Sequence, residues 1–320
     1  MAATEQGMLN REKLLGRVTA VFGKHIKIAG AAGEFEAEVR GKMLRNDLRE
    51  SPVAVGDNIE FTVESNNLAL IESVFPRKQV LSRPDVYVKD RRQIIVANLD
   101  QLMIITSTTK PHFSAGLVDR LLVNAESQAI KAIVVINKID LENEAGFAHY
   151  AKTWRDCGYP VIFTSAVTQD GLADLTATLK DKTSALAGHS GVGKSSLINE
   201  IDPSLDLKIR VISDATGKGV HTTAAVRMFP LKIGGWIADT PGLKVMTIAD
   251  IDKKDLQLHF PDFRNHIDDC RFSDCIHINE PDCGIKDAVK KGRVAEYRYQ
   301  SYQRLWHELA GNANAENWAS

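Results

Sequence analysis

One glycine-rich stretch of the sequence has the residue types and spacing of a phosphate-binding loop. Residues 188–195 read Gly-His-Ser-Gly-Val-Gly-Lys-Ser and match the pattern G-x-x-x-x-G-K-S in full. In such loops backbone N–H groups surround the phosphates, the lysine reaches the β- and γ-phosphates, and the final serine binds Mg²⁺. An apolar stretch precedes the motif and a helical pattern follows it, as the motif requires. We therefore expect phosphate contacts from Gly188, Ser190, Gly191, Val192, Gly193, Lys194 and Ser195, with Ser195 also binding magnesium.

A second motif selects the base. Asn137-Lys138-Ile139-Asp140 closes an apolar stretch, and the Asp140 carboxylate can accept two hydrogen bonds from guanine N1–H and its 2-amino group. Adenine lacks this donor pair, so the carboxylate would stay unpaired against ATP. Four residues alone also fit a polar loop between a strand and a helix. Together with the phosphate loop, they predict a site for GTP and GDP with base contacts from Asn137, Lys138, Asp140, Ser165 and Ala166.

Two further segments fit a switch that reads the γ-phosphate. Asp239-Thr240-Pro241-Gly242 follows a strand pattern, so Asp239 is expected to hold Mg²⁺ through water, and the Gly242 N–H to meet the γ-phosphate. Between this motif and the phosphate loop lies 217–223, where Thr222 or Thr223 could bind the metal only while the γ-phosphate is present. The sequence does not separate the two threonines, and a plain polar loop is the alternative.

The order of the motifs predicts a circular permutation and a slow intrinsic rate. Guanine recognition precedes the phosphate loop, the reverse of Ras-like proteins, and permutation moves only the chain break. Ras-like enzymes use a glutamine after D-x-x-G to orient the attacking water, whereas this chain has Leu243. His221 is the candidate to replace it, although a loop histidine can also be simply exposed. A partner that orders this loop would then raise the rate.

A third cluster predicts a metal centre. Cys270-x4-Cys275-x-His277-x5-Cys283 offers three thiolates and one imidazole, a tetrahedral set suited to one structural Zn²⁺. Unrelated buried cysteines are the alternative. Cys157 is distant in sequence and reads as a core residue.

The secondary-structure elements that must position these residues are predicted to form several domains. Short strand patterns separated by glycines predict an OB-like β-barrel, and strands alternating with helices then predict an α/β domain with a parallel sheet. Ligands in such sheets bind beyond the carboxyl ends of the strands. The predicted domains are an RNA-binding OB-like β-barrel at 1–76, a basic linker at 77–92, a circularly permuted P-loop GTPase at 93–247, and a zinc-binding, α-helical module at 248–320.

Two basic stretches leave their role open. The first could be a solvated linker or an RNA-facing patch, and comprises Arg77, Lys78, Arg83, Lys89, Arg91 and Arg92. The second follows the metal cluster and could meet RNA phosphates through Lys286, Lys290, Lys291, Arg293, Arg298 and Arg304. The aromatic residues of this second stretch have helical spacing, so packing against the protein body is favoured for Tyr299, Tyr302 and Trp306.

Composition is that of an ordinary soluble protein. The chain has 320 residues, 44% of them apolar and 25% charged, and a net charge of −1. It has no apolar stretch of the roughly 20 residues needed to cross a bilayer, and no pattern of a secretion signal at its start. We expect a cytoplasmic monomer without a membrane partner.

Taken together, the motifs resemble the ribosome small-subunit-dependent GTPase family of bacteria over roughly residues 10–310. The resemblance implies a GTPase that binds the small (30S) ribosomal subunit and its 16S rRNA late in maturation and hydrolyses GTP to GDP and phosphate faster when bound. It also implies phosphate contacts through Ser196 and the guanine and zinc roles given above. His189 departs from the glutamine frequent in that family. An RNA-binding scaffold is one alternative. A small-molecule kinase or metabolic NTPase with the same phosphate loop is another, and N-K-x-D argues against it.

Overall fold

The computed structural model describes residues 12–23, 25–40, 51–65, 67–85, 92–142, 144–205, 207, 226–240, 248 and 251–311. The chain divides into two compact units, one formed by 1–98 with 225–228 and the other by 99–224 with 229–320. Among the described helices, none combines the length and apolar character needed to cross a membrane.

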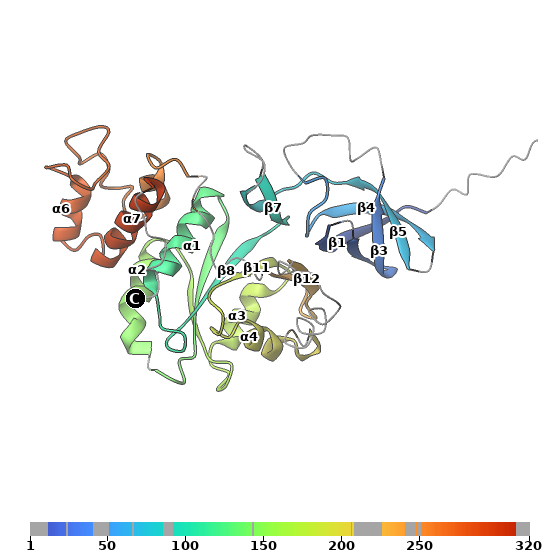
Figure 1. Ribbon diagram of the computed structural model, residues 1–320. Helices are drawn as coiled ribbons and strands as arrows, with labels where there is room; N and C mark the ends of the chain where they lie inside the picture. Colours follow the sequence, from blue (N-terminus) through green and yellow to red (C-terminus); the bar gives the residue numbers. More distant parts are fainter. Residues whose placement is uncertain are drawn as a thin grey trace, which may run out of the picture. The chain divides into compact units, whose positions relative to one another are not determined.

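The first unit contains a closed barrel (Figure 1). Its strands are β1 (Leu14–Phe22), β2 (His25–Gly30), β3 (Gly33–Val39), β4 (Asn58–Ser65) and β5 (Leu68–Val74). The strand order β1-β2-β3-β5-β4 returns to β1 through a β1–β4 pairing, so the sheet closes on itself. Alternate residues point inward, and the buried core includes Ile28, Ile59, Phe61 and Ile71. The predicted OB-like barrel is confirmed.

Part of the predicted basic linker forms a hairpin that the sequence analysis did not anticipate. Strands β6 (Val80–Pro84) and β7 (Arg92–Ala97) pair antiparallel. Just before them, Arg77 donates two hydrogen bonds, of 2.7 and 2.8 Å, to the fully buried Asp57 carboxylate. Arg77 is therefore committed to the fold and is not an RNA contact. Lys89 and Arg91 lie outside the described residues.

The second unit is built on a parallel sheet. Its strands are β8 (Gln101–Ser107), β9 (Lys131–Asn137), β10 (Val161–Thr164), β11 (Thr183–Ala187) and β13 (Trp236–Asp239), in the order β10-β9-β8-β11-β13. A short strand, β12 (Arg227–Pro230), precedes β13. Every residue of β8 is buried, as expected for a central strand covered on both faces. The predicted α/β domain is thus confirmed.

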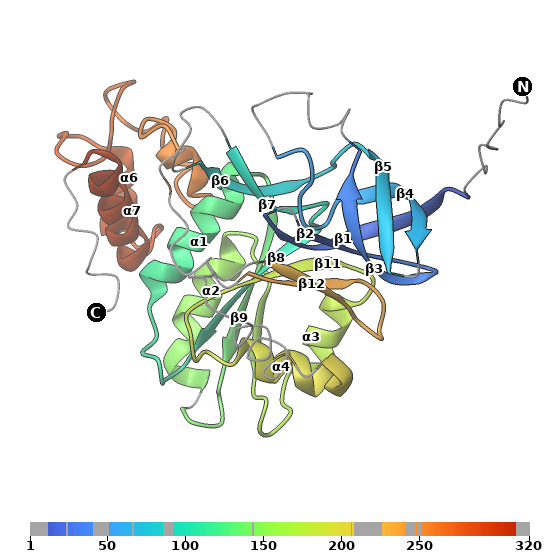
Figure 2. The ribbon, with the colours of Figure 1, turned by 45° about the vertical axis from the view of Figure 1, so that its right-hand side comes forward.

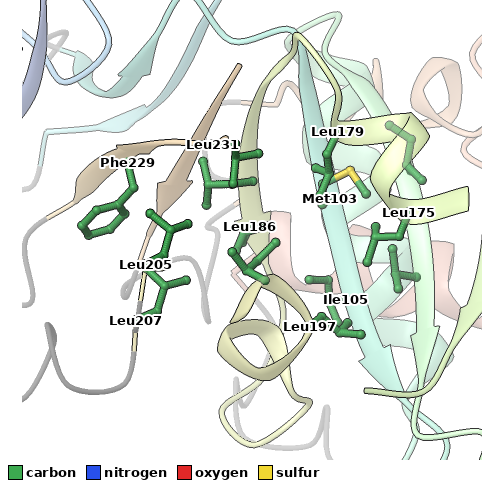
Figure 3. Close-up of a cluster of buried hydrophobic side chains, with 14 of the residues drawn as sticks. Met103, Ile105, Leu175, Leu179, Leu186, Leu197, Leu205, Leu207, Phe229 and Leu231 are labelled. Carbon is green, nitrogen blue, oxygen red and sulfur yellow. The ribbon is translucent and has the colours of Figure 1, made fainter. Parts of the chain in front are cut away.

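Helices cover both faces of this sheet. Helices α1 (Ala115–Ser127) and α2 (Ala148–Asp156) lie on the opposite side from α3 (Leu172–Leu179) and α4 (Lys194–Ile201) (Figures 1 and 2). On the α3–α4 side, Met103 and Leu186 from the strands pack with Leu179 and Leu197 from the helices (Figure 3). Short 3₁₀ helices span Glu144–Phe147, Pro203–Leu205 and Leu256–His259.

The C-terminal part packs on α1 through a buried charge network. It contains α6 (Gly284–Lys290) and α7 (Glu296–Leu309). Arg298 of α7 has no exposed surface and donates to Asp119 of α1 at 2.7 Å and to Asp262 at 2.8 Å. Trp154 Nε1 donates to the same Asp119 oxygen at 2.9 Å. The suggestion that Arg298 could meet RNA phosphates is therefore wrong, because its guanidinium already donates to two carboxylates.

The aromatic residues of α7 are packed as predicted. Tyr299 and Tyr302 belong to a buried cluster with Phe260 and Phe263, and Trp306 packs against its edge. Val123 of α1 belongs to the same cluster, so the C-terminal part and the α/β domain share a core.

Replacing Arg298 by Met should destabilise the protein strongly, because Asp119 would keep a buried charge without its partner. We expect a loss of about 3–5 kcal/mol in the free energy of unfolding, measured by denaturant titration of the full chain. The matched control is Arg304→Met on the exposed face of the same helix. Equal losses in the two variants would contradict the buried network.

Candidate functional site

The motifs of the α/β domain meet at the carboxyl edge of its sheet. The guanine motif leaves β9, the Ser165 loop leaves β10, the phosphate loop leaves β11, and Asp239 ends β13. The parallel pairings of these strands place all four segments at one edge. Ligand sites of open α/β sheets occupy this position.

The phosphate loop depends on glycines for steric reasons. Gly188 and Gly193 have φ angles of +137° and +97°, which residues with a Cβ rarely adopt. A Cβ on Gly188 would lie 2.0 Å from the Ile105 carbonyl oxygen, and one on Gly193 would lie 2.3 Å from Asn137 Nδ2. Neither position can therefore accept a side chain while its neighbours stay in place.

Lys194 lies across the loop that it is predicted to serve. Its ammonium group donates to the carbonyl oxygens of Gly188 and His189, both at 2.8 Å. Val192 anchors the loop, since its side chain is 2% exposed and packs in the core with Leu197. The loop thus has a fixed base and presents its backbone and one ammonium group at the sheet edge. Ser195 and Ser196 are half-buried at the start of α4.

Side chains of the guanine motif donate hydrogen bonds to the phosphate loop. The buried Asn137 amide donates to the Val192 carbonyl at 2.8 Å and accepts from the Thr164 hydroxyl at 3.1 Å. Lys138 Nζ donates to the Gly191 carbonyl at 2.6 Å. These bonds fix the distance between the base-recognition and phosphate-binding segments.

The Asp140 carboxylate is exposed but oriented. Ser165 donates its hydroxyl hydrogen to Asp140 Oδ1 at 2.6 Å. The same hydroxyl accepts from the backbone N–H groups of Val167 and Thr168, each at 3.1 Å, so its position is fixed in turn. A carboxylate held in this way retains enough lone pairs for two N–H donors of a guanine base. Ala166 lies beside Ser165 and packs against the core.

Two residues predicted to bind magnesium, Ser195 and Asp239, lie in the described part of the chain. Asp239 is opposite Leu186 in the β11–β13 pairing, and Thr240 donates to the Leu186 carbonyl at 2.7 Å. Burial raises the pKa of Asp239, and the positive charge of Lys194 opposes this shift. A carboxylate and the Ser195 hydroxyl are the oxygen ligands that Mg²⁺ prefers, so these residues fit that ion. His221, Thr222, Thr223 and Gly242 lie outside the described residues and stay predictions.

The predicted metal ligands come together. The ligand atoms of Cys270, Cys275, His277 and Cys283 all lie within 4.8 Å of one another. His277 Nδ1 is 3.5 Å from Cys270 Sγ and 3.4 Å from Cys283 Sγ, and the two sulfurs are 4.0 Å apart. A tetrahedral zinc site has edges of about 3.5 Å between nitrogen and sulfur and about 3.8 Å between sulfurs. The cluster therefore fits zinc with four protein ligands.

Surrounding groups orient these ligands. His277 Nε2 lies 2.6 Å from Gln257 Oε1, so it carries the ring hydrogen and leaves Nδ1 free to bind a metal. Burial lowers the pKa of His277 to about 4, which keeps the imidazole neutral. The Gly284 N–H donates to Cys270 Sγ at 3.3 Å. Gln257 was not predictable from the sequence, because no motif spacing connects it to the cluster.

A segment beside the guanine motif was likewise not predictable from the sequence. Thr108, just after β8, donates its hydroxyl hydrogen to the Lys138 carbonyl at 2.8 Å. Lys138 Nζ donates in turn to the Lys110 carbonyl. This segment carries no recognisable pattern, and only the order of the strands brings it to the site.

Comparisons with known proteins agree with this arrangement. A model of the RsgA GTPase family matches residues 74–249. A small ribosomal subunit biogenesis GTPase RsgA from Caldanaerobacter subterraneus subsp. tengcongensis is 38% identical over 298 residues, covering 93% of this chain and 96% of the relative. One of the same name from Chlorobaculum tepidum is 37% identical over 312 residues, with coverages of 94% and 99%.

Solved structures match as well. YjeQ from Thermotoga maritima superposes with a TM-score of 0.75 at 32% identity, covering 94% of this chain and 100% of that one. YloQ, described as a circularly permuted GTPase, gives a TM-score of 0.71 at 28% identity, with coverages of 96% and 99%. The permutation predicted from the order of the motifs is confirmed.

Replacing Asp140 by Asn should change base selectivity, because an amide N–H would face the donors of guanine. We expect the affinity for GDP to fall about 100-fold or more, and xanthosine diphosphate, which has a carbonyl in place of the 2-amino group, to bind better than GDP. Titration of the two nucleotides gives the ratio. Asp174→Asn on the exposed face of α3 is the control. An unchanged ratio in the Asp140 variant would refute base recognition by this residue.

Replacing Cys283 by Ser should remove zinc and lower the melting temperature. We expect one zinc ion per chain in the unmodified protein by elemental analysis. Without zinc, the free energy of unfolding should fall by about 3 kcal/mol or more, which would lower the melting temperature by roughly 6–12 °C. Cys157→Ser, outside the cluster, should retain the zinc ion. A Cys283 variant with full zinc content would show that the cluster does not hold the metal.

Proposed function

Because this chain belongs to the RsgA GTPase family and is a GTP-hydrolysing enzyme, we propose that it acts in late maturation of the small (30S) ribosomal subunit. It binds the subunit, hydrolyses GTP to GDP and phosphate there, and is stimulated by that binding. Two observations support this most directly. The predicted base-binding and phosphate-binding loops are joined by a hydrogen bond, and the chain is similar to a small ribosomal subunit biogenesis GTPase over more than nine-tenths of both chains.

In this proposal the nucleotide spans the sheet edge. Asp140 accepts from guanine, the backbone of 188–195 surrounds the phosphates, and Lys194 exchanges its two carbonyl partners for phosphate oxygens. Ser195 and Asp239 would hold Mg²⁺, which would supply positive charge against the charge that develops on the phosphates. Zinc has a structural role, because the four protein ligands leave no open position for a substrate.

The stimulated rate depends on a residue that orients the attacking water. Leu243 occupies the position of the water-orienting glutamine, so the free enzyme is slow. His221 orients the attacking water when the small subunit is bound. The nucleotide state reaches the C-terminal module along the chain, because β13 ends at Asp239 and Ile248 is already buried in the C-terminal core. The peptide between them includes Gly242, whose N–H is predicted to meet the γ-phosphate.

The RNA contacts come from basic residues that the fold leaves exposed. With Arg77 and Arg298 committed to buried ion pairs, the candidates in the C-terminal module are Lys290, Lys291, Arg293 and Arg304. These residues contact phosphates of 16S rRNA, so binding weakens as salt rises. We propose that the protein works as a cytoplasmic monomer.

Purified small subunits should raise the GTPase rate at least tenfold, that is by about 1.4 kcal/mol or more in barrier height, and higher salt should reduce this effect. Turnover is measured with and without subunits at two salt concentrations. His221→Ala should abolish the stimulation and leave GDP affinity within about twofold, whereas His149→Ala on α2 should behave like the unmodified enzyme.

Two outcomes separate the parts of the proposal. Stimulation that persists in the His221 variant would remove the catalytic assignment alone. If large subunits stimulated as well as small ones, or if neither did, the ribosomal function itself would be rejected.

A further inference from the structure

The segment after β8 lies between the two nucleotide-binding loops. In the strand order β10-β9-β8-β11-β13, β8 separates the guanine strand β9 from the phosphate strand β11. The peptide leaving β8 at the same edge therefore reaches both loops. Its first residue, Thr108, is 3% exposed.

Thr108 holds two successive carbonyl groups of the guanine motif. Its backbone N–H donates to the Asn137 carbonyl at 3.0 Å, and its hydroxyl donates to the Lys138 carbonyl at 2.8 Å. The Lys138 carbonyl also accepts from the Leu141 N–H at 3.0 Å, which closes a turn over 138–141. This turn carries Asp140. Thr108 thus anchors the turn that aims the base-recognising carboxylate.

The turn needs such an anchor because its backbone is strained. Lys138 has a φ angle of +67°, which costs a residue with a side chain about 1 kcal/mol or more. The hydrogen bond from the Thr108 hydroxyl favours this turn geometry. In an unstrained turn the Lys138 carbonyl would move away, and the buried hydroxyl would be left without its acceptor.

Other contacts of the segment make it a firm support. The Lys110 carbonyl accepts from Lys138 Nζ, and a Cβ on Gly191 would lie 3.7 Å from Pro111 Cδ, so this proline is near the phosphate loop. Further on, the ring of Phe113 packs 5.0 Å from Phe147 and 4.7 Å from Tyr150, between ring centres. The segment is therefore held at both ends.

We propose that Thr108 is a positioning residue for guanine selectivity, acting through the 138–141 turn and not by contact with the nucleotide. This inference rests on the proposed binding of guanine at Asp140. It predicts that loss of the hydroxyl weakens recognition of the base and leaves phosphate chemistry unchanged.

The test is Thr108→Val in the full chain, which keeps the side-chain size and removes the donor. GDP and IDP are the probes, because IDP lacks only the 2-amino group that Asp140 recognises. The variant should lose about tenfold in GDP affinity and much less in IDP affinity, with kcat at saturating GTP within about twofold of the unmodified enzyme. Thr108→Ser should restore the GDP preference.

Thr109→Val is the matched control, because the Thr109 hydroxyl has no hydrogen-bond partner in the described part of the chain. Equal GDP to IDP ratios in the Thr108→Val, Thr109→Val and unmodified proteins would overturn the inference. So would equal losses for both nucleotides accompanied by a lower melting temperature, since that pattern marks a purely structural residue. If the unmodified protein bound GDP and IDP equally, the guanine site itself would fail and this inference with it.

Discussion

The Asn137 amide joins two loops that lie far apart in the sequence. The geometry of the nucleotide site depends on the hydrogen bonds of this junction. The amide donates to the phosphate loop at Val192 and accepts from Thr164 at the end of β10. Gly193 leaves the space that this amide needs, since a Cβ there would lie 2.3 Å from Nδ2. The distance between the predicted base-binding and phosphate-binding loops is thereby set by the protein itself, which would lower the entropic cost of nucleotide binding.

Permutation leaves this junction intact because it depends on strand order and not on chain order. The strand β8 between the guanine and phosphate strands supplies Thr108 at the same edge. What permutation changes is the continuation of the chain. After Asp239 the chain enters the C-terminal core at Ile248, and that core is tied to α1 through Arg298 and Asp119. The proposed transmission from the γ-phosphate to the zinc-binding module follows from this connection.

Contiguous motifs allowed the candidate nucleotide and metal sites to be predicted from the sequence. Asn137–Asp140, Gly188–Ser195 and the zinc cluster each place several chemical groups at short, characteristic spacings. Thr108 and Gln257 were not predictable, since each is a single polar residue that reaches its partner only through tertiary structure. Arg298 was misread for the same reason: its partner Asp119 is distant in sequence, so a basic stretch appeared free to bind RNA. Likewise, the many charged residues of 77–92 gave no strand pattern, so the hairpin of β6 and β7 was not predicted.

The central claim is that one guanine nucleotide is held at both ends by loops of fixed separation. The most direct test is a crystal structure with Mg²⁺ and a non-hydrolysable GTP analogue. It should show the Asp140 carboxylate paired with N1–H and the 2-amino group, Lys194 on the β- and γ-phosphates, and the Asn137–Val192 hydrogen bond preserved. A base turned away from Asp140, or a nucleotide bound with that hydrogen bond broken, would contradict the account.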